Sequence, residues 1–177
     1  MLALHGMTKD AWRRFSDKGY VHYDVVEVGF KYNMMDIQAA IGIHQLARVE
    51  RLWRRRQEIW RRYDEAFAEL PVFVPEAPAP GTRHALHLYT LLLDLERTNV
   101  SRDEFLERMT KRQIGTGVHY RAVHLHPVYQ ERFGYRRGQL PNAEWISDRT
   151  VSLPLSAKLS DTDVGDVIEA VKASLDA

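Results

Sequence analysis

The feature that most constrains the fold is a long stretch of helical periodicity over residues 35–70. Apolar side chains recur there at three- and four-residue steps, with one break at Arg56, and this spacing places them on one face of an α-helix. They are Leu46, Val49, Trp53, Trp60, Tyr63, Phe67 and Leu70. Pro71 cannot continue the helix, and the proline-rich residues 75–81 indicate a stiff connector. The sequence therefore predicts one long helix that ends at this connector.

Beyond the connector, the pattern alternates between short strands and short helices. Ser101 and Glu104 have the spacing of a capping box, and Ser160 is placed to cap the last helix. Two further helices begin at a proline, Pro127 and Pro141. The expected strands are 84–94, 115–120 and 150–153, and the expected helices are 101–112, 127–133, 141–149 and the stretch after 160. This order predicts an α/β fold: a small α+β domain with a mostly antiparallel sheet and helices on one face.

The first 34 residues have a weaker pattern. Residues 8–17 suggest a short helix, and residues 20–28 form an extended, aromatic run that Gly29 closes. Too few apolar positions repeat on one face to form a complete packing unit.

Composition excludes several classes of protein. The absence of cysteine rules out a disulfide scaffold, a thiolate metal site and a cysteine nucleophile. No apolar stretch approaches the roughly 20 residues that cross a bilayer. The 25 basic and 24 acidic residues leave a net charge of +1, which argues against a dedicated nucleic-acid binder. We expect a cytoplasmic protein that binds neither membranes nor nucleic acid.

A cluster of arginines on the long helix has two interpretations. It consists of Arg48, Arg51, Arg54, Arg55, Arg56, Arg61 and Arg62. The cluster could bind the phosphates of a nucleic acid. It could equally be a solvated helix face, because acidic residues lie at spacings that allow pairing. We prefer the second interpretation because no aromatic stacking platform or zinc motif accompanies the arginines.

A run of polar residues around His119 is the best candidate for a ligand site. The preceding Gly-Thr-Gly lets the backbone approach another group closely, and the run then brings His119, Tyr120 and Arg121 into a loop. These side chains can donate hydrogen bonds to an anionic or oxygen-rich ligand, although the loop could also satisfy only its own backbone. His124 and His126 could share a face, but a metal would lack a nearby carboxylate ligand. We therefore predict no metal site.

Two segments resemble a known family. Residues 29–42 (GFKYNMMDIQAAIG) and 112–124 (RQIGTGVHYRAVH) resemble the signatures of the DegT/DnrJ/EryC1/StrS sugar-nucleotide aminotransferases. Residues 127–133, 140–145 and 152–155 occur in that family in the same order. Within the family, these segments look most like the branch that forms UDP-4-amino-4-deoxy-L-arabinose.

The resemblance implies a fold-type I enzyme that uses pyridoxal 5′-phosphate (PLP). In such enzymes glutamate gives its amino group to the cofactor and leaves as 2-oxoglutarate, and a nucleotide-linked 4-keto sugar is then aminated. The family's Schiff-base lysine precedes the His5-Gly6 match and would lie before Met1, so we expect no catalytic residue in this chain and no activity from it alone. The chain would be a C-terminal part: residues 1–34 a remnant of the large PLP domain and inter-subunit loop, 35–70 a connecting helix, and 71–177 the small α/β domain.

The resemblance also assigns site residues. These enzymes are homodimers with shared active sites, in which a long-loop asparagine reaches the cofactor phosphate of the neighbouring subunit. Asn33, and second Lys31, are the candidates for that contact. His119, Tyr120 and His124 match the loop that contacts the sugar nucleotide, and Arg121 is a candidate for its diphosphate. The alternative is a catalytically inactive dimerisation or ligand-binding module of the same fold.

Overall fold

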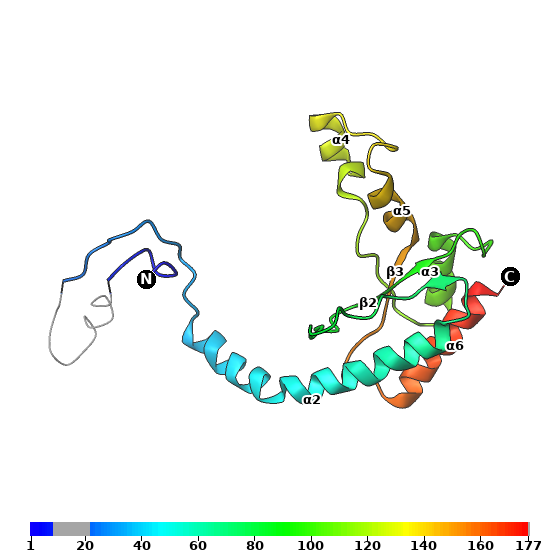
Figure 1. The fold of residues 1–177 in the computed structure, drawn as a ribbon, viewed down its shortest axis with the longest axis horizontal. Coiled ribbons are helices and arrows are strands. Elements are labelled where there is room, and N and C mark those ends of the chain that lie inside the picture. The colour runs from blue at the N-terminus through cyan, green and yellow to red at the C-terminus, as the bar shows by residue number, and fades with distance from the viewer. Residues whose placement is uncertain (9–21, 177) are drawn as a thin grey trace. The chain divides into compact units, whose positions relative to one another are not determined.

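The computed structural model describes residues 1–8 and 22–176 (Figure 1). Contacts within the chain form two compact units, Met1–Val49 and Glu50–Ala177. Most of the helix expected at residues 8–17, and the start of the extended run at 20–28, lie outside the described residues. Among the described residues, no helix is both long enough and apolar enough to cross a bilayer.

The first unit contains a narrow turn held by backbone hydrogen bonds. Isolated β-bridges join Leu4 to Lys31 and Met7 to Val25. Gly6 adopts a positive φ of 69°, and a Cβ built there would lie only 1.8 Å from the carbonyl oxygen of Glu27. Only glycine permits so close an approach of the two backbones.

The long helix is present as predicted. Helix α2 covers Asp36–Phe67, so both ends lie within three residues of the expected boundaries. Its buried side chains, Ile59, Tyr63 and Phe67, all belong to its C-terminal half. The division between the two units falls inside this helix, after Val49.

A three-stranded antiparallel sheet follows the helix, as predicted. Its order is β1 (Val72–Phe73), β2 (Tyr89–Leu93) and β3 (Thr150–Leu153). In the register of β2 with β3, Tyr89 lies opposite Leu153. The expected strand at 150–153 is confirmed, whereas β1 was not predicted.

Two expected strands differ from the structure. The strand expected at 84–94 begins only at Tyr89, because the chain first turns at Leu86, whose φ is 49° and whose N–H donates to His84 Nδ1 at 3.2 Å. The strand expected at 115–120 is reduced to one bridge between Gly117 and Ser152. The backbone of this segment therefore pairs with β3 at one residue, and the residues after Gly117 form a loop.

Among the described residues, four shorter α-helices begin where the sequence predicts. They are α3 (Arg102–Lys111), α4 (Pro127–Phe133), α5 (Pro141–Arg149) and α6 (Asp161–Leu175), and a 3₁₀ turn covers Val123–Leu125. Ser160 and Asp163 form a reciprocal capping box at the start of α6. Ser101 Oγ accepts the N–H of Glu104 at 3.2 Å, but the Glu104 carboxylate binds Arg108 instead of completing the box.

The core of the second unit lies on one face of the sheet. Tyr89, Leu91 and Leu93 alternate along β2 and are fully buried, because residues two apart point to the same side of a strand. They pack in one cluster with side chains of α2, α3 and α6. From these helices the cluster includes Ile59, Tyr63, Phe67, Phe105, Met109, Val164, Val167 and Val171. The predicted packing on one face of the sheet therefore holds for α2, α3 and α6, whereas Trp145 of α5 contacts Phe73, which points to the other side of β1.

Candidate functional site

The loop predicted to bind substrate begins at a close contact with β3. Gly117 and Ser152 exchange both backbone hydrogen bonds, at 3.0 and 2.8 Å. His119 Nδ1 lies 2.8 Å from Ser152 Oγ. A Cβ at Gly117 would come within 2.9 Å of the His119 ring. The second glycine of Gly-Thr-Gly therefore makes room for the histidine two residues later.

The end of the loop is held by helix α5. The N–H of Ala122 donates to Ser147 Oγ at 2.9 Å. His124 Nε2 lies 2.9 Å from Glu144 Oε1, and both residues are buried, with 4% and 6% of their surface exposed. Glu144 and Ser147 are three residues apart, so they lie on the same face of α5. One helix face therefore fixes the loop at two points.

Glu144 is the centre of a wider network of hydrogen bonds. Its carboxylate accepts the N–H of Gly138 at 2.8 and 2.9 Å and the N–H of Leu140 at 3.2 Å. The Gly138 N–H lowers the pKa of Glu144 most, burial opposes that shift, and the bond from His124 lowers the pKa further. Glu144 is therefore ionised at neutral pH.

The four predicted substrate residues divide into two pairs. His119 and His124 are bound to neighbouring elements, as described above. Tyr120 is 73% exposed, and Arg121 is also exposed. Neither Tyr120 nor Arg121 makes a side-chain hydrogen bond within the part of the chain that the structure describes. The anchored loop therefore exposes the phenol of Tyr120 and the guanidinium of Arg121 to solvent.

The sequence reasoning missed the residues that anchor this loop. We expected no carboxylate near His124, and this was wrong, because Glu144 binds it across a separation of 20 residues. The family-like segments 140–145 and 152–155 contain Glu144 and Ser152, which was the signal for their importance. The described residues contain no group of three His, Asp or Glu side chains that could hold a metal.

The predicted phosphate contacts, Lys31 and Asn33, lie in the first unit. Lys31 itself forms the β-bridge with Leu4, and the N–H of the neighbouring Tyr32 donates to the Ala3 carbonyl at 2.8 Å. The side chains of Lys31 and Asn33 are exposed and make no hydrogen bond or ion pair to other described residues. Their donors are therefore available to phosphate oxygens, which fits the group that the resemblance implies.

Part of the arginine cluster on α2 is paired with acidic residues. Arg55 and Arg62 both bind Asp161 at the start of α6, at 2.8 and 2.9 Å, and Arg61 pairs with Glu65. The Arg55 guanidinium holds the pKa of Asp161 below its usual value. This pairing favours the interpretation of the cluster as a solvated, ion-paired helix face.

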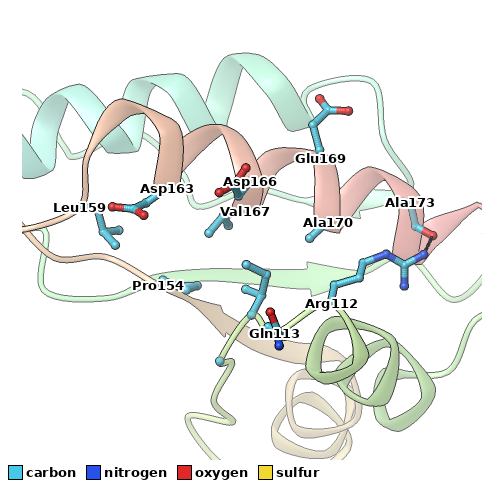
Figure 2. A pocket seen from close by; sticks show the side chains of 12 residues that line it. Arg112, Gln113, Pro154, Leu159, Asp163, Asp166, Val167, Glu169, Ala170 and Ala173 are labelled. Atoms are coloured by element: carbon cyan, nitrogen blue, oxygen red, sulfur yellow. Dashed lines mark hydrogen bonds between the residues drawn. The ribbon is translucent and has the colours of Figure 1, made fainter.

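A pocket of about 650 Å³ lies between α6 and the segment after α3 (Figure 2). Its floor includes Ile114 and Val167, and its rim carries the carboxylates of Asp166 and Glu169. Arg112 spans one end and donates to the Ala173 carbonyl at 3.0 Å. None of the predicted substrate residues lines this pocket.

A second pocket, of about 740 Å³, lies between α2 and residues 77–86. Trp53 and Trp60 form part of its wall. The Arg83 guanidinium covers the Trp53 ring at 4.1 Å, and Trp53 Nε1 donates to the His84 carbonyl at 2.8 Å. This pocket is also separate from the predicted substrate loop.

Comparison with known proteins identifies the class. The model of the DegT/DnrJ/EryC1/StrS aminotransferase family matches residues 1–172, so the chain belongs to this family. It is 46% identical over 173 residues to the spore coat polysaccharide biosynthesis protein SpsC of Bacillus subtilis (strain 168), covering 97% of this chain and 44% of SpsC. It is also 46% identical to the protein MJ1066 of Methanocaldococcus jannaschii over 172 residues, covering 97% of this chain and 45% of that protein.

Solved structures agree with the family assignment. The PMP form of Spr1654 from Streptococcus pneumoniae superimposes with a TM-score of 0.80 at 32% identity, covering 98% of this chain and 43% of that one. PseC of Helicobacter pylori, an aminotransferase of pseudoaminic acid biosynthesis, gives 0.76 at 27% identity, covering 98% and 44%. The fold is that of fold-type I PLP aminotransferases. The chain spans less than half the length of these relatives.

Proposed function

We propose that this chain is the part of a PLP-dependent sugar-nucleotide aminotransferase that follows the catalytic lysine. The complete enzyme would transfer an amino group from glutamate to a keto group of a nucleotide-linked sugar. The observation that carries this proposal is the family match over residues 1–172, together with relatives named for the biosynthesis of a spore coat polysaccharide and of pseudoaminic acid. These names give no support to the arabinose branch, so the proposal stops at the class of substrate.

The chain's own part in this reaction is to bind and orient the sugar nucleotide. Arg121 is exposed and has five N–H donors in a planar fork, which suits the paired oxygens of a diphosphate. Tyr120 presents a hydroxyl that can donate to or accept from a sugar hydroxyl. His119 and His124 hold the two ends of the loop, each through one ring nitrogen. The other nitrogen of each ring is a second possible contact for substrate. We therefore assign direct substrate contact first to Tyr120 and Arg121.

Lys31 and Asn33 are proposed to hold the phosphate of the cofactor, in a homodimer whose subunits share their sites. PLP, when bound, supplies the electron sink that makes amino transfer possible. Lys31 offers a positive charge and Asn33 a neutral amide donor, and both side chains are free to turn toward a phosphate. We also propose that residues 1–34 are a remnant of the large PLP domain and inter-subunit loop, that 35–70 form a connecting helix, and that 71–177 form the small domain. We propose a cytoplasmic location for the enzyme.

A chimeric enzyme tests the proposed function. This chain would replace the matching 44% of SpsC, which would supply the remaining segment. We expect the chimera to take up the amino group of glutamate, which a change in the absorbance of the cofactor reports, and to aminate a nucleotide-linked 4-keto sugar. Arg121→Ala should impair sugar amination while the glutamate half-reaction continues.

The chain without the SpsC segment is the matched control. With PLP, glutamate and the same nucleotide-linked 4-keto sugar, it should give no aminated product above background. Turnover by this chain alone would contradict the proposed need for a lysine outside it. Equal sugar amination by the Arg121→Ala chimera and its parent would contradict the assignment of the substrate loop.

A further inference from the structure

The buried pair of His124 and Glu144 joins the end of the substrate loop to helix α5. His124 ends the loop that carries Tyr120 and Arg121. Glu144 also binds the N–H groups of Gly138 and Leu140, which belong to the turn before α5. All residues from 126 to 143 are exposed, so this turn has little apolar packing to hold it. One carboxylate therefore contacts both the substrate loop and the turn, and the ion pair of Arg137 with Asp148, at 2.7 Å, also holds the turn.

The direction of the hydrogen bond follows from the charge of Glu144. An ionised carboxylate has no proton to donate, so the N–H at His124 Nε2 must be the donor. His124 Nδ1 makes no hydrogen bond to any residue that the structure describes. Glu144 therefore selects the ring nitrogen that carries the proton, and it orients the ring.

We propose that Glu144 is a positioning residue of the substrate loop, which acts through His124 to hold Tyr120 and Arg121 in the orientation that binds a sugar nucleotide. This inference rests on the proposed function, because it takes this loop to be the part that meets the substrate. Ser147 also holds this loop, because its hydroxyl accepts the N–H of Ala122. That hydroxyl is neutral and accepts a single hydrogen bond from the loop. A buried, charge-assisted hydrogen bond is the stronger of the two.

Two substitutions separate positioning from simple packing. Glu144→Leu keeps a side chain of similar size but removes every acceptor, whereas Glu144→Gln keeps one acceptor oxygen. If the carboxylate positions the loop, Glu144→Leu should have the larger effect and Glu144→Gln should retain part of the wild-type behaviour. If only space filling matters, the two variants should behave alike. Glu131→Gln, on exposed α4, is the control for the loss of a carboxylate.

Nuclear magnetic resonance of the 177-residue chain provides the measurement. In the wild type we expect a proton on His124 Nε2 that is protected from exchange with water. In Glu144→Leu this signal should be lost, and amide exchange at residues 120–124 should rise about tenfold while that of Leu91 in β2 stays unchanged. Glu131→Gln should match the wild type.

The inference is overturned if the wild-type ring carries its proton only on Nδ1, or if Glu144→Leu exchanges its loop amides at the wild-type rate. If Glu144→Leu does not fold, the wild-type ring signal and the Glu144→Gln exchange rates decide the question. Titration with UDP-glucose separates this result from the proposed function. If the wild-type loop is protected from exchange but its resonances do not shift when UDP-glucose is added, the proposed binding of a sugar nucleotide is contradicted. The anchoring of the loop by Glu144 would still stand.

Discussion

The two units of the chain use the same kind of apolar pattern to different effect. In Glu50–Ala177, α2 buries Ile59, Tyr63 and Phe67 against the sheet and two other helices. In Met1–Val49, the apolar side chains of the same helix are exposed: Ile41 is 58% exposed, whereas Ile59 is fully buried. The periodicity therefore predicted the helix correctly, but it did not predict which half would find a partner within the described chain.

The largest expected effect comes from two isoleucines of α2. Ile59→Ala removes a fully buried side chain and should lower the free energy of unfolding by about 2–5 kcal/mol. Ile41→Ala, on the same helix, should change it by less than about 0.5 kcal/mol. Urea denaturation of both variants measures the difference. Equal losses would mean that the N-terminal half of α2 is buried in solution.

The next largest effect is expected from acid, which acts on several carboxylates of the second unit together. The Gly138 N–H lowers the pKa of Glu144, and the Arg137 guanidinium lowers that of Asp148. The pKa values of Asp161 and Asp163 are lowered as well. Because these groups bind protons more weakly in the folded state, their stabilisation is complete above the unfolded values of about 4.5 and 3.8.

That stabilisation should disappear as the pH falls through the lower folded-state pKa values. Urea denaturation between pH 6 and 2.5 should therefore show the free energy of unfolding falling below about pH 4.5. Glu144→Gln should make this decline shallower. A decline that begins well above pH 5, or one that Glu144→Gln leaves unaltered, would disagree with these ionisation states.

The smallest effect compares two helix caps. Ser160 caps α6 in a reciprocal box with Asp163, whereas Ser101 caps α3 from one side only. Removing a serine cap lowers the free energy of unfolding by about 1 kcal/mol on average. The loss from Ser160→Ala should be larger than the loss from Ser101→Ala by a few tenths of that amount. Thermal unfolding of the two variants gives the order. The reverse order would show that the Asp163 carboxylate adds nothing to the cap.

Local signals predicted most of the fold of the second unit. Prolines at Pro127 and Pro141 and the cap at Ser160 placed three helix starts correctly, because each acts on its own backbone. The strand expected at 115–120 was wrong because pairing depends on a distant partner, and only Gly117 forms a backbone bridge to β3. Long-range pairing leaves little trace in a single segment.

The candidate site was predicted in part for the same reason. The run from His119 to His124 was recognised from its residue types and its resemblance to the family. Glu144 and Ser152 hold this run from other elements. Both belong to family-like segments, but their local sequence pattern did not predict which residues they contact. The sequence therefore predicted the residues whose side chains suit ligand binding, but it did not predict Glu144 and Ser152 as the residues that hold them in place.

The central claim is that the loop with Tyr120 and Arg121 binds a sugar nucleotide, and titration of the isotope-labelled chain with UDP-glucose tests it most directly. We predict that the amide resonances of Tyr120 and Arg121 shift in a saturable manner and that Arg121→Ala weakens binding at least about tenfold. The pockets lined by Trp53 and by Asp166 should remain unperturbed. Saturable shifts centred on either pocket, or no shift at the loop, would contradict the claim.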